Sequence, residues 1–100
     1  MQTVTLEQLK QQVNVDTADT TYDEQLEQMA DEAEALVLEY TGRELAWFTE
    51  HYGGIPLPLR RAVLLLVGDW FAYREGGRPS NLRPAEEAIA PIINRYRRLI

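Results

Sequence analysis

The chain has 100 residues, no cysteine and a net charge of −6, so it is long enough for one domain with one small core. The lack of cysteine excludes disulfides and thiolate metal sites. No basic stretch leads into an apolar run at the start, and the longest aliphatic run, residues 62–67, is far shorter than the ~20 residues that span a bilayer. We expect a soluble, unsecreted protein with no membrane partner, whose single domain covers residues 1–100.

Charge is divided unevenly between the two halves of the chain. Residues 1–50 carry twelve acidic residues against Lys10 and Arg43, a net charge of −10, whereas residues 51–100 carry four acidic residues against eight arginines, a net charge of +4. One interpretation is a solvated acidic surface that keeps the protein soluble. The other is self-complementarity, in which the acidic half of one copy meets the basic half of the next; such head-to-tail contacts can close into a ring.

Two capping boxes predict the first two helices. Thr5 with Gln8 predicts a short helix over residues 6–12, and Thr21 with Glu24 predicts a second helix of about nineteen residues. Residues 14–20 are rich in Asp, Thr and Asn and predict a loop. Eight residues of the second helix fall on one apolar stripe and should face the core: Tyr22, Leu26, Met29, Ala30, Ala33, Leu36, Val37 and Tyr40.

The rest of the second helix is acidic and contains no basic residue. Like charges one turn apart repel each other by a few tenths of a kcal/mol per pair, so a helix that keeps them either tolerates the repulsion or uses the field. Leu38 lies among these acids, away from the stripe, and is a candidate contact with a partner. The face comprises Asp23, Glu24, Glu27, Asp31, Glu32, Glu34 and Glu39, of which Glu24, Glu27, Asp31 and Glu34 are the candidates for a conduit lining or an acidic interface.

Gly42 fits the left-handed residue that ends this helix. Residues 44–57 contain several aromatic residues, a Gly-Gly pair and a proline, so we expect an ordered loop with room for a short strand pair. Trp47 and Phe48 should pack on the core, which we favour over a role in stacking a ligand.

The third helix is predicted over residues 59–75, with Pro58 in its first turn. Its apolar residues cover more than half of the circumference, which is typical of a helix in the middle of a bundle. Gly68 suggests the close approach of another backbone. Asp69 borders the apolar sector and needs a partner, most simply an arginine of another helix or another subunit, and Arg61 lies on the narrow polar strip.

The last helix should begin near Pro84, and Pro91 should either kink it or start a separate last turn. Arg95, Arg97 and Arg98 surround Tyr96. Three arginines in a terminal segment suggest that this segment binds an acidic surface, and the second helix of another copy is the candidate. Together with Leu38, Arg61 and Asp69, they form the candidate subunit interface.

Signatures of catalysis are missing from the sequence. His51 is the only histidine and is more simply a structural residue than a base, and the Gly-Gly pairs lack the context of a phosphate loop. Asp16 and Asp19 lack the glycine and the final glutamate of a calcium loop. We therefore expect no enzyme activity, no metal site and no cofactor. The pI near 4.7 argues against a sequence-specific DNA reader, but an acidic wall could let a duplex slide past.

Several blocks of sequence occur in a distinctive order. After a short first helix comes an acidic helix that ends in Tyr40-Thr41-Gly42-Arg43, and then the aromatic segment. Leu57-Pro58 opens an apolar helix that reaches Trp70-Phe71 and Arg74-Glu75, and a short last segment carries Ala90-Pro91-Ile92 and Tyr96-Arg97. In this order, the blocks resemble the small head–tail connectors of long-tailed bacteriophages, also called DNA-packaging adaptors, along nearly the whole chain.

The predicted elements give an all-α fold, a small bundle of about four helices with the ordered aromatic loop between the second and third, and the resemblance likewise implies a small helical bundle. It also implies a structural virion protein that forms a homo-oligomeric ring beneath the portal protein, joins the head to tail or head-completion proteins, and extends the conduit for double-stranded DNA. Such a protein assembles in the host cytoplasm and ends at the head–tail junction of the virion. The alternative from the residues alone is a small acidic regulatory or DNA-mimicking protein that binds a basic partner.

Overall fold

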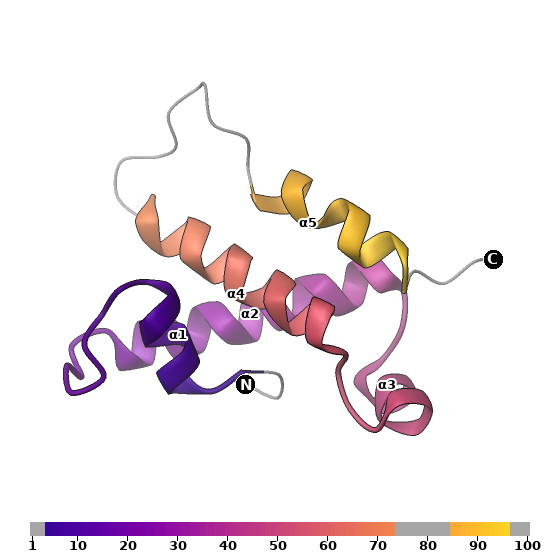
Figure 1. Ribbon diagram of the computed structural model, residues 1–100, viewed down its shortest axis with the longest axis horizontal. Coiled ribbons are helices and arrows are strands. Elements are labelled where there is room, and N and C mark those ends of the chain that lie inside the picture. The colour runs from indigo at the N-terminus through magenta and orange to yellow at the C-terminus, as the bar shows by residue number, and fades with distance from the viewer. Residues whose placement is uncertain (1–3, 74–84, 97–100) are drawn as a thin grey trace.

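The computed structural model describes residues 4–73 and 85–96 (Figure 1). Within these ranges all regular structure is helical, which confirms the all-α fold. The bundle has one helix more than expected, because the aromatic segment contains a helix of its own. The helices of the described residues are α1 (Leu6–Gln12), α2 (Asp23–Thr41), α3 (Leu45–Tyr52), α4 (Leu57–Ala72) and α5 (Ala85–Asn94).

Helix α4 lies in the middle of the bundle, as its apolar circumference predicts. It packs against α1, α2 and α5, and α2 also packs against α1 and α5. The Cα atoms extend over 40 × 33 × 16 Å, a slab two helix layers thick, since packed helices lie roughly 8–10 Å apart. The side chains of α4 that form the centre of the core are Leu59, Ala62, Val63, Leu66, Val67 and Phe71.

The first capping box is confirmed and the second is wrong. The Thr5 Oγ1 accepts a hydrogen bond from the Gln8 N–H at 3.2 Å, and the Gln8 side chain accepts one from the Thr5 N–H at 2.9 Å. By contrast, α2 begins after Tyr22 without a side-chain cap. Thr21 lies outside the helix, where its N–H donates to Asp19 Oδ1 at 2.9 Å. Asp19 thus holds the backbone of Thr21 in a turn that precedes the helix.

The stripe of α2 is confirmed except at its last residue. Leu26, Ala30, Ala33 and Val37 are buried, and Tyr22, Met29 and Leu36 pack partly against the core. Tyr40, however, is 41% exposed, and the buried residue of the last turn is Thr41. Thr41 tolerates burial because its hydroxyl donates to the Leu38 carbonyl at 2.7 Å. Helical periodicity gives the direction of Tyr40 but not where the neighbouring helices end.

The segment expected to be a loop contains helix α3, so the loop and the strand pair are wrong for residues 45–52. Left-handed glycines lie on both sides of it: Gly42 at φ 68° ends α2, as predicted, and Gly53 at φ 76° ends α3. These residues let the chain stop and restart helices within a few positions. The packing role is confirmed, because Phe48 is fully buried and Trp47 packs partly against the core.

One prediction about α4 needs correction, and one of the two alternatives for α5 is excluded. The close neighbour of Gly68 is the Gln12 side chain, not a backbone: a Cβ at this position would lie 3.3 Å from Gln12 Nε2. Helix α5 continues through Pro91 instead of breaking into a separate turn. Both Pro91 and Glu87, whose carbonyl loses its helical hydrogen bond, are exposed, so water can satisfy that carbonyl. Pro58 is in the first turn of α4, as predicted, while Pro84 and residues 74–77 lie outside the described residues.

Candidate functional site

The acidic face of α2 is largely solvent-exposed. Glu24, Glu27 and Asp31 are exposed, whereas Glu34 is half-buried because it lies closer to the core stripe. At about 3.6 residues per turn, these four carboxylates share one side of α2. We call them the acidic row. Asp23 and Glu24 are in the first turn, where the helix dipole favours a negative charge.

Both basic residues of the first half of the chain are engaged inside the molecule. Lys10 is only 4% exposed, and its Nζ lies 2.8 Å from Asp23 Oδ1 and donates to the Thr17 carbonyl at 3.0 Å. Arg43 is half-buried at the end of α2. Neither cation pairs with Glu24 or Glu27, which form no ion pair within the described residues. Sequence analysis identified the lack of basic residues on this helix but not the burial of Lys10.

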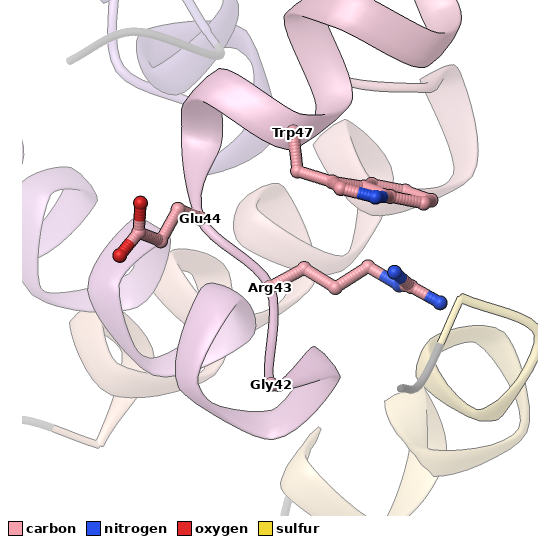
Figure 2. Close-up of a pocket in the computed structure, with 4 residues that line it drawn as sticks. All are labelled: Gly42, Arg43, Glu44 and Trp47. Atoms are coloured by element: carbon pink, nitrogen blue, oxygen red, sulfur yellow. The ribbon is translucent and has the colours of Figure 1, made fainter. Parts of the chain in front are cut away.

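Arg43 joins three segments of the fold. Its Nε donates to the Tyr96 carbonyl, beyond α5, at 3.0 Å, and its Cζ lies 3.7 Å from the centre of the Trp47 ring on α3. Figure 2 shows the guanidinium beneath the indole, while Glu44 points away from both. The Arg43 N–H also donates to Thr41 Oγ1 at 3.3 Å. A pocket of about 370 Å³ is lined by Gly42, Arg43, Glu44 and Trp47. The Arg43 guanidinium in this pocket is already bound to the Tyr96 carbonyl and the Trp47 ring.

His51 packs against the same tryptophan ring as Arg43. Its ring stacks on Trp47 with 4.2 Å between the centres and an angle of 22° between the planes. Arg43 and His51 must cover opposite faces of the indole, because both lie too close to its centre to share one face. The His51 Nδ1 lies 2.9 Å from the Trp47 carbonyl oxygen, so this nitrogen carries the proton and donates it. The geometry favours the structural role expected of this histidine.

The predicted interface residues have different environments. Leu38 is half-buried and packs against the core, so its expected position away from the core is wrong. Asp69 is half-buried. Arg61, on α4, and Arg95, in the turn after α5, are exposed. Arg97 and Arg98 lie outside the described residues. A role of this set at a subunit interface stays a prediction.

A groove that sequence analysis did not identify lies between α1, α4 and α5, with a volume of about 470 Å³. Its walls are mainly aliphatic, and Arg60 and Arg61 stand at its edge. Leu57, the first residue of α4, is 76% exposed beside it. We call this the Leu57 groove. It is lined by Val4, Gln8, Leu57, Pro58, Arg60, Arg61, Leu64 and Ile92.

Comparison with known proteins identifies the family. A family model described as phage gp6-like head-tail connector protein matches residues 3–97. The chain belongs to this family. No curated protein and no solved structure matches it. The connector is therefore a structural phage protein of the head–tail junction that associates with other head and tail proteins, and its family is not one of enzymes.

The fold explains two sequence blocks of the connector. In Thr41-Gly42-Arg43, the hydroxyl closes the end of α2, the glycine turns the chain, and the arginine attaches α3 and the segment after α5. The Leu57-Pro58 block starts the central helix at the edge of the groove. Among the described residues, no three His, Asp or Glu side chains gather as metal ligands would, and no helix is long and apolar enough to cross a membrane.

Proposed function

We propose that the connector assembles as a homo-oligomeric ring beneath the portal protein, where it extends the passage for double-stranded DNA and receives the tail or head-completion proteins. It would assemble in the host cytoplasm and then become part of the virion, with no cofactor and no membrane partner. Membership of the head–tail connector family supports this role. It also argues against the alternative of a small acidic regulatory or DNA-mimicking protein.

The observation that carries the proposal is the acidic row of α2, in which Glu24, Glu27 and Asp31 are exposed. Glu24 and Glu27 form no ion pair within the described residues. We propose that the acidic row faces the DNA in the assembled ring. A wall of negative charge repels phosphate, so a duplex can pass without being held. Lys10 and Arg43 are engaged elsewhere in the fold, so neither of them pairs with Glu24 or Glu27.

Charge reversal on the acidic row tests the proposed function. We expect Glu24→Lys/Glu27→Lys/Asp31→Lys to fold and assemble, because all three side chains are exposed. In assembled particles, the introduced lysines would bind phosphate and slow or stop DNA passage, an effect that weakens as salt rises. The measurements are circular dichroism for folding, light scattering for assembly, and the amount of DNA packaged and released by particles that carry the variant.

The matched control is Glu7→Lys/Glu50→Lys/Glu87→Lys. These glutamates are exposed on α1, α3 and α5, so the net charge changes equally while the acidic row stays intact. Normal DNA passage is expected in the control. If both triple variants pass DNA normally, the acidic row is only a solvated surface. If the acidic-row variant fails to assemble, these carboxylates face a neighbouring subunit and not the DNA.

A further inference from the structure

We propose that the Leu57 groove of one copy binds a defined part of α2 of the next copy, and that this contact closes the ring. This part of α2 comprises Glu32, Leu36, Glu39 and Tyr40, which we call the Tyr40 patch. The inference rests on the proposed ring and assigns the two surfaces that meet.

The groove has the chemistry of a helix-binding site. Along α4, Leu57, Arg61 and Leu64 fall on one stripe, whereas the fully buried Leu59 and Leu66 fall on the opposite side. The stripe that carries the groove therefore lies opposite Leu59 and Leu66, and its Leu64 packs partly against the core. Aliphatic side chains form its walls, and Arg61 is exposed at its edge. An amphipathic helix with apolar and acidic residues on one side would fit this combination.

Tyr40 is the best apolar candidate to enter the groove. Among the described residues, the large apolar or aromatic side chains that are exposed are Tyr40, Tyr52 and Leu57. The Tyr52 ring already packs on the rings of Trp47, Phe48 and Tyr96, whereas within the described residues Tyr40 contacts no other ring. An exposed tyrosine with a free ring is a common anchor of protein interfaces.

The charges beside Tyr40 complement the edge of the groove. Glu39 is adjacent to it, and Glu32 lies two turns before it on a neighbouring row of α2; both are exposed. Within the described residues neither forms an ion pair. They can reach Arg61 of the next copy, and Arg60 as well, although the Arg60 Nε already donates to the Ile55 carbonyl at 2.9 Å. Opposite charges at the rim orient two partners and exclude wrong registers.

The arrangement suits a ring because the two surfaces differ. The Tyr40 patch lies on α2, whereas residues of α1, α4 and α5 line the Leu57 groove. A contact between two different surfaces is head-to-tail, and repetition of that contact closes into a ring when the rotation allows. The Tyr40 patch is also separate from the acidic row, roughly a third of a turn around α2. One helix can thus face a neighbour with one side and DNA with another.

A charge exchange tests this contact. We expect Arg61→Glu alone and Glu32→Arg/Glu39→Arg alone each to raise the concentration needed for half-assembly by roughly tenfold or more, about 1.4 kcal/mol. Combination of the two sets in one chain restores opposite charges across the contact, so assembly should recover. Leu57→Ser, which changes an exposed apolar residue, should also weaken assembly without unfolding the protein. Light scattering and sedimentation measure assembly, and circular dichroism measures folding.

The matched control is Arg61→Glu combined with Glu24→Arg/Glu27→Arg. It reverses two carboxylates of the same helix, but on the acidic row, so it should not restore assembly. Recovery in this control, or no recovery in the Glu32/Glu39 exchange, overturns the inference. Assembly of the wild type together with unaffected single variants also overturns it, while the proposed ring stands. A wild type that stays monomeric under all conditions rejects both.

Discussion

At the scale of single residues, Arg43 shows why one cation can organise a small core. Its guanidinium is shared between a backbone carbonyl after α5 and the face of Trp47 on α3. Lysine carries the same charge, but it has no planar group that can stack on the indole and donate sideways at the same time. The interaction depends on the shape of the guanidinium, so the position should not accept another cation.

We therefore expect Arg43→Lys to lower the free energy of unfolding by about 1–3 kcal/mol, the combined loss of a charged hydrogen bond and part of a cation–π contact. Urea unfolding followed by tryptophan fluorescence measures it. Arg61→Lys, on the exposed strip of α4, is the control and should change stability by less than about 0.5 kcal/mol. Equal effects at the two positions would show that the stack contributes nothing.

Asp19 provides a second prediction at this scale. Hydrogen bonds from the side chain and the backbone of Thr21 hold the pKa of Asp19 below its ordinary value of 3.8. Since the pKa is lowered in the folded state, the stability from this turn is present above the unfolded pKa. It is lost as the pH falls through the folded pKa.

We expect Thr21→Val to raise the pKa of Asp19 part of the way back, because the hydroxyl is lost while the backbone N–H still donates. NMR titration of the Asp19 carboxyl measures this. Thr20→Val is the control and should leave the titration where it was. A titration of Asp19 that does not move in Thr21→Val would mean that the hydroxyl does not hold this carboxylate.

At the scale of elements, α3 is positioned by the turns beside it. It lies at the edge of the bundle (Figure 1), between Gly42 and Gly53, and is held by the buried Phe48 and by the Arg43 guanidinium over the Trp47 ring. Gly53 and Gly68 make a useful contrast. At Gly53 an added Cβ would meet nothing within 4 Å, but φ is +76°. At Gly68 the backbone is helical and the Cβ would approach the Gln12 side chain, with Nε2 at 3.3 Å and Cγ at 3.4 Å.

We expect Gly53→Ala to destabilise the protein by about 1–2 kcal/mol, because a Cβ is strained in the left-handed conformation whatever space surrounds it. Gly53→Asn should cost less, since Asn tolerates this conformation better. Gly68→Ala should be neutral or stabilising by up to about 1 kcal/mol, because the exposed Gln12 can move and Ala favours the helix. Thermal unfolding of the three variants checks this order, and a larger loss at Gly68 than at Gly53 contradicts it.

At the scale of the whole molecule, the charge division and the flat shape act together. The slab is 16 Å across its shortest dimension and exposes an acidic α2, while the Leu57 groove belongs to α1, α4 and α5. If copies meet through opposite charges, higher concentration should favour assembly and salt should weaken it, because the Debye length falls to about 3 Å at 1 M salt.

We expect the mass measured by light scattering to rise with protein concentration and to fall when salt is raised at fixed concentration. Urea unfolding monitored in the same buffers is the control, since salt should act on the contact between copies more than on the fold. A strictly monomeric mass at every concentration and salt would favour the small acidic regulatory protein over the ring.

The sequence by itself determined what depends on neighbours along the chain. The capping box at Thr5, the apolar stripe from Leu26 to Val37 and the left-handed end at Gly42 were predicted correctly because hydrogen bonds and helical spacing act within a few residues. The order of blocks also indicated the connector family, which the match over residues 3–97 confirms.

Only the tertiary structure decided the features that join distant segments. Lys10 is buried against Asp23 and Thr17, Arg43 reaches Tyr96, and Tyr40 is exposed although its helical direction points towards the core. The Leu57 groove combines residues of three helices, from Val4 to Ile92. Burial and pairing at these places depend on where other helices begin and end, and local spacing along one helix holds no information about that.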